Sequence, residues 1–225
     1  MARDDVRLEQ TLGREPGRWP LDRLILVPAE LKLTSVTMDL MESIRVAPGN
    51  RVAAREIVLR IDDTPLKRWF IDVAQHAGQW RFEVLGGIQR RPTAVSVARR
   101  VPSRKLLRDL FQRDGYRCRY CSERVIGDRE QFKRLAELID VPELLTTGSN
   151  ESRHGIYLMY RASHDHVVPH SQSGGDGLDN LVTACWPCQF GKYRFSLDEL
   201  HMPAAPGPIA EFDDKWLSAL ARLSK

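Results

Sequence analysis

The sequence predicts an α+β fold organised around four paired cysteines. Three observations lead to this prediction. The cysteines form two Cys-x-x-Cys pairs, several segments place apolar residues at helical spacing behind capping residues, and other short runs are rich in the β-branched and aromatic residues typical of strands. We expect a small α+β N-terminal module at residues 1–100, a larger domain at 101–202 that is stapled by the cysteines, and a C-terminal helix within 203–225 that packs on the core.

Length and composition are those of an ordinary globular protein. The chain has 225 residues, of which 42% are hydrophobic and 28% charged, which argues against a disordered or fibrous class. Its first ten residues, MARDDVRLEQ, lack the apolar stretch of a secretory signal, and no apolar run approaches the roughly 20 residues that span a bilayer. We therefore expect an intracellular, cytoplasmic protein.

The first hundred residues contain no motif that identifies a function. The runs RLILVPAELKL (23–33), EIVLRI (56–61) and residues 81–85 are typical of strands, and LKRWFIDVAQHAG (66–78) is typical of a helix that Gly78 ends. This α+β module has an unknown role, for which target recognition is one candidate. An arginine-rich stretch at 90–105, interrupted by two prolines, joins it to the rest of the chain.

Helix signals become clear in the second domain. Ser103 is a candidate N-cap for an amphipathic helix that Asp114 and Gly115 stop, and Asp128 with Gln131 resembles a capping box before a second amphipathic helix. We expect a further helical turn at Pro142, a strand over residues 155–162 and a capped turn at Ser196. The terminal helix would place one apolar face on the core, formed by Ile209, Phe212, Trp216, Leu220 and Leu223.

The positive charge of the chain is concentrated in one segment. Residues 90–119 hold nine Arg and one Lys against two Asp, an excess of +8, although the net charge of the whole chain is only +4. Such a segment is typical of a nucleic-acid-binding surface, although a solvated basic face would look the same. The candidate nucleic-acid contacts in it are Arg99, Arg100, Arg104, Lys105 and Arg108.

The four cysteines predict a structural zinc site. Cys118 and Cys121 form one pair, and Cys185 and Cys188 form the other. A two-residue spacing lets both thiolates of a tight turn face one tetrahedral ion, and in a reducing compartment this use is more common than disulfides. Free buried thiols and a redox Cys-x-x-Cys pair are the alternatives, but nothing nearby resembles a thioredoxin-type unit. Four thiolates would leave no open position for water, so the predicted zinc is structural.

The segment between the two pairs resembles a known family. It reads HDHVVPHSQSGGDGLDNLVTACWPCQFGK from His164 to Lys192 and resembles the HNH endonucleases. The matching positions are Asp165, His166, Pro169, Ser171, Gly174, Gly175, Asn180, Leu181, Cys185, Cys188 and Lys192. The resemblance covers somewhat under half of the chain and implies a ββα-metal fold, in which Asp165 and His166 lie on a hairpin facing a helix that begins near Cys188.

The resemblance also implies a mechanism and a role for each residue. His166 would be the general base, Asp165 a ligand of a catalytic Mg²⁺ or Mn²⁺, and Asn180 the residue that holds the loop. The family places Asn or His directly after the second pair as another metal ligand, whereas this chain has Gln189 there. Its longer side chain leaves direct, water-mediated or lost coordination open. Lys192, one helical turn later, would contact phosphate.

These assignments lead to one main hypothesis and one alternative. The main hypothesis is a metal-dependent DNA endonuclease, which acts on double-stranded DNA in restriction, phage defence or a mobile element and leaves 5′-phosphate and 3′-hydroxyl ends. A homodimer would be needed for a double-strand break. The alternative is a catalytically silent, HNH-like zinc module that binds nucleic acid or a protein. His164 is expected to be a hydrogen-bonding neighbour of the site rather than a ligand, and His170 a residue of the loop surface.

Overall fold

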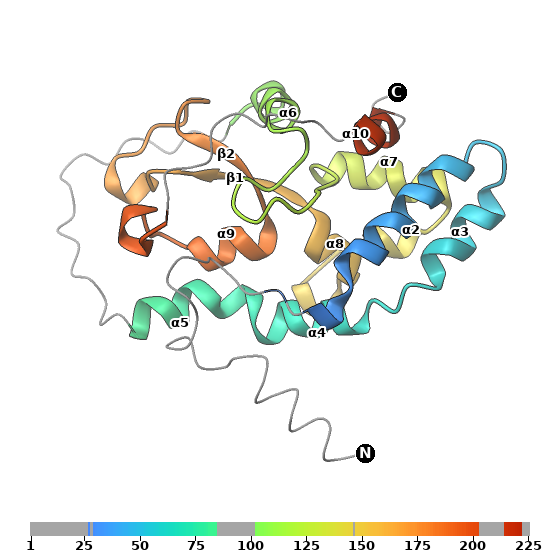
Figure 1. The fold of residues 1–225 in the computed structure, drawn as a ribbon, viewed down its shortest axis with the longest axis horizontal. Coiled ribbons are helices and arrows are strands. Elements are labelled where there is room, and N and C mark those ends of the chain that lie inside the picture. Colours follow the sequence, from blue (N-terminus) through green and yellow to red (C-terminus); the bar gives the residue numbers. More distant parts are fainter. Residues whose placement is uncertain (1–26, 28, 85–101, 146, 203–213, 222–225) are drawn as a thin grey trace, which may run out of the picture.

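A computed structural model describes residues 27, 29–84, 102–145, 147–202 and 214–221 of the chain. Figure 1 shows short helices around one two-stranded sheet. The helices and strands in chain order are α2 (Leu33–Val46), α3 (Arg51–Leu59), α4 (Thr64–Asp72), α5 (Ala77–Val84), α6 (Arg104–Arg113), α7 (Arg129–Ile139), α8 (Gly155–Tyr160), β1 (Ala162–His166), β2 (Leu181–Cys185), α9 (Trp186–Lys192) and α10 (Asp214–Ala221). Single 3-10 turns lie at Ala29–Leu31, Ala74–His76, Pro142–Leu145, Asn150–Ser152, His170–Gln172 and Asp198–Leu200.

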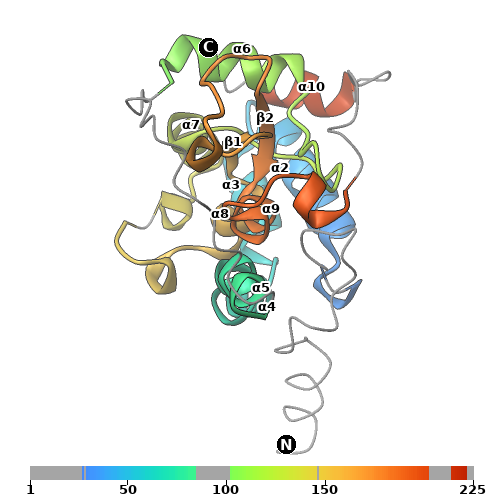
Figure 2. The same cartoon turned by 90° about the vertical axis from the view of Figure 1, so that its left-hand side faces the viewer.

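The sheet lies between layers of helices. Strands β1 and β2 pair antiparallel, with Ala162 opposite Cys185 and His166 opposite Leu181. Helix α6 packs on the strands from one side and α9 from the other, and α5 packs under α9, as the views in Figures 1 and 2 agree. The hairpin is therefore held at the centre of a helical stack. This mixed helix and sheet architecture confirms the predicted α+β class.

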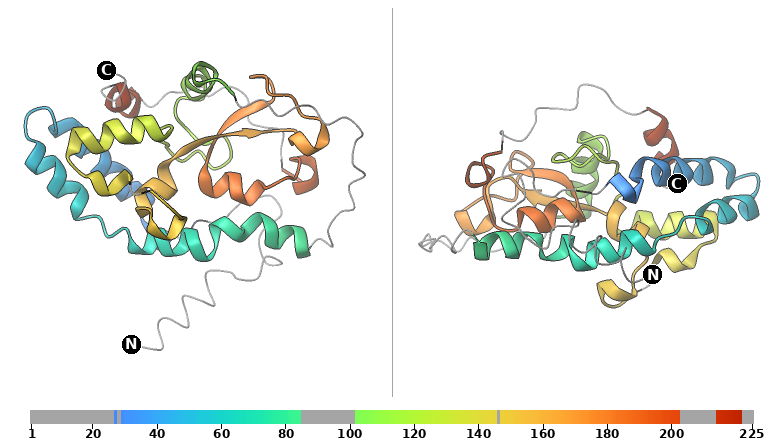
Figure 3. Two further views of the ribbon diagram at one scale, coloured as in Figure 1. Left: turned by 180° about the vertical axis from the view of Figure 1, so that it is seen from behind. Right: turned by 60° about the horizontal axis from the view of Figure 1, so that its bottom comes forward.

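The other end of the molecule is helical. Helices α2 and α3 form an antiparallel pair against α7, and Figure 3 shows this group at the end away from the hairpin. One hydrophobic cluster of the described residues runs from α2 through α4 to the hairpin and α9. Trp216 of α10 is buried, and its Nε1 donates to the Val125 carbonyl over 3.1 Å. Of the apolar face predicted for the C-terminal helix, Ile209, Phe212 and Leu223 lie outside the described residues.

Local capping signals identified two helices correctly. The Ser103 Oγ accepts from the Leu106 N–H at the start of α6, and Asp128 forms a complete capping box with Gln131 at the start of α7. The turns predicted at Pro142 and Ser196 are also present, the latter with the Ser196 Oγ accepting from the Glu199 N–H over 3.2 Å. These signals are reliable because a cap bonds within the same few residues that encode it.

The strands predicted for the N-terminal module are wrong wherever the structure describes them. Residues 56–59 belong to helix α3, which starts at the N-cap Asn50, and residues 81–84 belong to α5. The helix predicted over 66–78 is divided: α4 ends at Asp72, a 3-10 turn follows at Ala74–His76, and Gly78 lies in the first turn of α5 instead of ending a helix. A Cβ at that glycine would lie 2.2 Å from the Phe190 carbonyl oxygen, so the residue serves close packing against α9. The described part of the module, residues 29–84, is helical; the predicted boundary near residue 100 and residues 23–26 lie outside the description.

A further correction concerns residues 155–162, which were expected to be one strand. Residues Gly155–Tyr160 form helix α8, and only Ala162 begins a strand. All six residues of α8 are buried, and a run that is apolar on every side carries no helical or strand periodicity. The His154 Nδ1 caps this helix by accepting from the Ile156 N–H.

Candidate active site and metal centre

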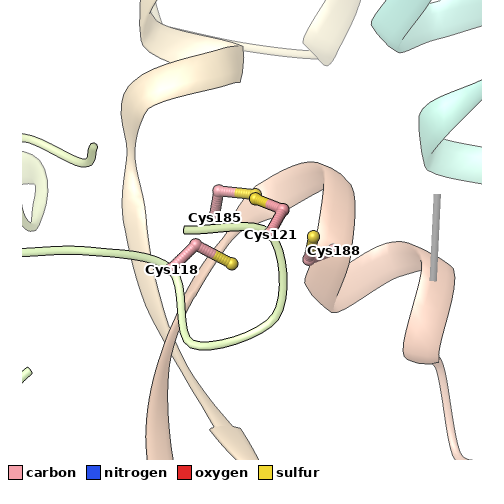
Figure 4. Close-up of side chains that lie close together, drawn as sticks. All are labelled: Cys118, Cys121, Cys185 and Cys188. Carbon is pink, nitrogen blue, oxygen red and sulfur yellow. The ribbon is translucent and has the colours of Figure 1, made fainter. Parts of the chain in front are cut away.

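The four cysteines gather in one cluster. Figure 4 shows the first pair on the loop after α6 and the second pair at the junction of β2 and α9, with the four sulfur atoms turned toward a common centre. All four Sγ atoms lie within 4.8 Å of one another, and those of Cys121 and Cys185 are 3.8 Å apart. A tetrahedral zinc ion with bonds of about 2.3 Å requires sulfur separations of about 3.8 Å. The donor set and its spacing therefore fit a structural zinc ion.

Backbone contacts tie the first cysteine pair to the sheet. The Cys118 N–H bonds the Glu123 carbonyl, and Ser122 closes the turn with a left-handed φ of 65°. The Arg119 N–H then donates to the Thr183 carbonyl of β2 over 2.8 Å. The buried Asp114 carboxylate accepts from the Thr183 N–H over 2.7 Å. Hydrogen bonds thus link the end of α6, the first pair and β2.

Asp165 lies on the face of β1 that packs against α9. It is 7% exposed, and its Oδ2 accepts from the Tyr120 hydroxyl over 2.6 Å and from the Lys192 Nζ over 3.1 Å. Burial raises the pKa of Asp165, while Lys192, Tyr120 and His166 act to lower it. Burial and the adjacent Asp165 raise the pKa of Tyr120, so its phenol stays protonated and donates. Asp165 is therefore a buried, partly neutralised carboxylate.

Lys192 lies inside the protein rather than on its surface. Its side chain is 1% exposed and donates to the His166 carbonyl over 2.5 Å as well as to Asp165. The phosphate contact predicted for it stays a prediction, since in this conformation the ammonium holds the end of β1.

His166 is paired with a residue that the sequence analysis did not identify. Its Nε2 lies 2.8 Å from Oδ1 of Asp176, and both side chains are about one-fifth exposed. Asp176 belongs to the Gly-Gly-Asp-Gly loop between β1 and β2. An acidic residue in a loop of glycines beside a candidate base was the available signal. The rings of His164 and His170 lie edge-on to His166, each with a centroid distance of 6.0 Å.

Asn180 holds the two ends of this loop together. Its Oδ1 accepts from the Val168 N–H over 2.8 Å, and its Nδ2 donates to the carbonyls of Val168 and Gly175 at 3.0 and 2.9 Å. Gly174 is also required here, because a Cβ on it would lie 1.8 Å from the Val168 carbonyl oxygen. This network fixes the loop that carries Asp176.

Comparison with known proteins agrees with this geometry. Residues 150–192, about a fifth of the chain, match the family model of the HNH endonucleases. The chain contains an HNH domain. The match covers α8, both strands and α9, which are the elements that hold Asp165, His166 and the second cysteine pair. No curated protein and no solved structure matches the chain.

The HNH domain departs from the family pattern at Gln189. This residue is half-buried on the first turns of α9, and its Nε2 donates to the His164 carbonyl over 3.2 Å. That bond occupies the amide nitrogen and leaves Oε1 as the atom able to ligate a cation. In the described part of the chain, the four cysteines are the one group of three or more His, Cys, Asp or Glu side chains gathered for an ion. A second ion would therefore bind few protein ligands, as Mg²⁺ commonly does when it keeps waters.

The predicted nucleic-acid contacts are partly placed by the structure. Arg104, Lys105 and Arg108 are exposed on α6, where Lys105 pairs with Asp109 over 2.7 Å. Arg99 and Arg100 lie outside the described residues. Among the described residues, no helix is both long and apolar enough to cross a bilayer.

Proposed function

We propose that the HNH domain is a metal-dependent endonuclease that hydrolyses phosphodiester bonds of double-stranded DNA. One observation carries the proposal: Asp165 and His166 lie side by side at the end of β1, within the residues that match the HNH family, with α9 packed behind them. Membership of this domain in a nuclease family supports nucleic acid as the substrate class.

His166 is the proposed general base. The Asp176 carboxylate accepts from its Nε2, which selects the tautomer with the proton on that nitrogen and leaves the Nδ1 lone pair to take a proton from water. The carboxylate also stabilises the imidazolium that forms, as in other pairs in which a carboxylate orients a histidine. Asp176 is therefore a positioning residue, and Asn180 acts one step further away by fixing its loop.

Asp165 and Gln189 are the proposed ligands of a catalytic Mg²⁺ or Mn²⁺ ion. Tyr120 and Lys192 both bond Oδ2 of Asp165, so Oδ1 is the oxygen left for an ion. When bound, the ion would supply positive charge to the phosphate and the leaving oxygen. Oxygen donors suit such hard cations. Lys192 keeps Asp165 ionised and in place through its buried ion pair.

One observation favours a second candidate, a catalytically silent module that binds nucleic acid or a partner protein. The Lys192 ammonium already compensates Asp165, and the Gln189 amide already bonds the His164 carbonyl. A protein of this kind would keep its zinc and its binding surface but would have no catalytic ion.

Plasmid cleavage with Mg²⁺ or Mn²⁺ separates these candidates. Wild type and His166→Ala are compared at equal zinc content. We expect metal-dependent nicking that the substitution reduces about 100- to 10,000-fold, the range of general base catalysis. A single HNH centre nicks one strand, so linear product would indicate a homodimer. Equal inactivity of both proteins, with DNA binding retained, would support the silent module.

Two further variants test the roles of individual residues. Asp176→Asn should lower cleavage about tenfold to 100-fold and move the pH profile of cleavage, whereas Asp179→Asn, an exposed acid in the same loop, should not. Gln189→Asn restores the family residue and should lower the concentration of Mg²⁺ required. Unchanged pH and metal profiles would remove Asp176 and Gln189 from the mechanism.

A further inference from the structure

A cavity outside the HNH catalytic residues gathers three arginines. Its volume is about 300 Å³, at the small end of the range for ligand sites. Arg129 at the start of α7, Arg153 before α8 and Arg161 before β1 line it, together with Tyr157 and the loop residues Thr147 and Gly148. None of the described lining residues is acidic. Three positive charges therefore meet without a carboxylate in the lining.

Two of these arginines are held rigidly. The guanidinium of Arg161 lies 4.6 Å from the ring centroid of Trp186, and that of Arg153 lies 5.5 Å from it. Arg161 also donates to the Tyr157 hydroxyl over 2.8 Å, and Arg153 donates to the Asn150 Oδ1. Because stacking and hydrogen bonds fix the two guanidinium groups, little side-chain entropy remains to be lost when an anion binds.

Arg161, one of the lining residues, has an unsatisfied donor and lies among repelling positive charges. The Nε of Arg161 is buried and has no hydrogen-bond partner within the described residues. Burial lowers the pKa of Arg161, and Arg153 and Arg129 lower it further, while Tyr157 and Asp128 act in the opposite direction. A bound oxyanion would relieve the repulsion among the guanidinium groups and could accept their free N–H groups.

The position of the cavity relates it to the catalytic residues. Trp186 begins α9 and Lys192 ends it, so Arg161 of the cavity and Asp165 contact opposite ends of this helix. Arg161 precedes Asp165 by four residues, which is about 13 Å along an extended chain. This separation is short enough for phosphates a few nucleotides apart on one strand to reach both places.

We propose that the cavity lined by Arg129, Arg153 and Arg161 binds a backbone phosphate of the nucleic-acid strand, a few nucleotides from the phosphate that lies at His166. The proposal rests on the proposed function for the identity of the ligand. Planar guanidinium groups match the oxygen geometry of phosphate. The site sets where the strand lies and reads no base.

The test is a binding experiment in which cleavage is prevented by His166→Ala. In this background, Arg129→Gln/Arg153→Gln is compared with Arg45→Gln/Arg60→Gln, which removes the same charge from exposed positions that do not line the cavity. Fluorescence anisotropy with a labelled DNA duplex gives the affinity between about 50 and 200 mM salt. We expect the cavity variant to lose about tenfold in affinity and about one unit of the slope of log affinity against log salt, and the control to change much less.

Each other outcome has a defined meaning. Equal changes in the two double variants would overturn the proposal. A second outcome is that the cavity variant loses calorimetric binding of a mononucleotide but keeps its affinity for DNA. That result would also overturn the proposal and assign the cavity to a free nucleotide. If the double variant melts earlier or loses zinc, Arg129→Gln alone serves, because Arg129 is exposed and its removal should cost part of the same salt slope. The binding contrast is independent of cleavage, so a protein that binds as expected but never cuts would refute the nuclease and keep the phosphate site.

Discussion

Lys192→Met removes one half of the buried ion pair at the centre of the HNH domain. The substitution keeps most of the length and volume of the side chain but removes the ammonium that lies 3.1 Å from the Asp165 Oδ2. The Asp165 carboxylate would keep its bond from Tyr120 and lose its counter-charge, and the His166 carbonyl would lose a donor. The change therefore leaves a charge in a site that water scarcely reaches.

The separation of the two groups gives the size of the effect. With an effective dielectric constant of about 20, two unit charges at 3.1 Å attract by about 5 kcal/mol. Breaking a buried pair by removing one partner commonly costs about 3–5 kcal/mol, because the other charge stays buried. We expect Lys192→Met to lower the free energy of unfolding by about this amount.

Urea unfolding of zinc-loaded protein, without other divalent ions, measures the effect in a double-mutant cycle. Lys192→Met is made in the wild type and in Asp165→Asn, where no carboxylate remains to be stranded. In the Asp165→Asn background, Lys192→Met should lower the free energy of unfolding far less than in the wild type. The difference, which is the coupling energy between the two sites, should be at least about 2 kcal/mol. A cost below about 1 kcal/mol in the wild type, or costs that add, would show that Lys192 does not stabilise Asp165.

Three further changes test the fold. Gly155→Ala should cost about 1–3 kcal/mol in urea unfolding, because its Cβ would lie 2.5 Å from the carbonyl oxygen of Asp63, the N-cap residue of α4. The control Gly175→Ala places a Cβ with nothing within 4 Å and should be close to neutral. Equal effects of the two substitutions would contradict this packing. Burial lowers the pKa of His154 below its ordinary 6.5, although Asp63 opposes this. The stability that the neutral His154 gives the folded protein is therefore complete above about pH 6.5 and is lost as the pH falls through the lowered pKa. His154→Asn keeps a cap acceptor for α8 without a titrating group, and it should lose less stability than wild type between about pH 7 and 5, by at most about 1.4 kcal/mol per pH unit; parallel stability curves would argue against this role. Chelation of zinc should abolish hydrogen-exchange protection of β1 and β2 and expose the thiols of all four cysteines to titration. Structural zinc sites contribute about 10 kcal/mol or more to folding. Retained protection in the zinc-free protein would show that the hydrogen bonds between the first cysteine pair and β2 hold the sheet by themselves.

The parts of the fold that could be predicted from sequence are those encoded over a few residues. Ser103 and Asp128 start their helices through bonds to backbone groups two or three positions later. The zinc cluster was predictable for a related reason, since each Cys-x-x-Cys turn already presents two thiolates. Bringing the two pairs together needed only the assumption that all four cysteines bind one ion.

The failed predictions concern segments whose apolar residues are buried on more than one side. Gly155–Tyr160 was assigned to a strand because of its aliphatic and aromatic content, but α4 and α9 cover it on different sides. Residues 56–61 contain no capping signal of their own, because the cap of α3 is Asn50, which lies six residues before this segment and accepts from the Ala53 N–H through its side chain. In both cases tertiary contacts or a distant cap outweighed local propensity.

The candidate site shows the same division. Asp165, His166, Asn180 and Gln189 belong to one short segment and could be identified from its pattern. Asp176 lies in that segment too, but its contact with His166 depends on how the Gly-Gly-Asp-Gly loop folds back. Tyr120, which donates to Asp165, and Arg161, which stacks on Trp186, lie outside the two strands and α9. No spacing in the sequence predicts either contact.

Helix α9 explains why the zinc cluster and the candidate catalytic residues belong to one structure. Its first turn contributes Cys188, the next residue is Gln189, and Lys192 follows one turn later, so the position of the zinc sets the position of the groups that face β1. The far end of the helix is fixed from α5, where the buried Arg81 donates to the Gly191 carbonyl over 3.0 Å. Because that contact comes from the N-terminal region, the helices before residue 85 are part of the scaffold that holds the HNH site, whatever role the region has in choosing a target.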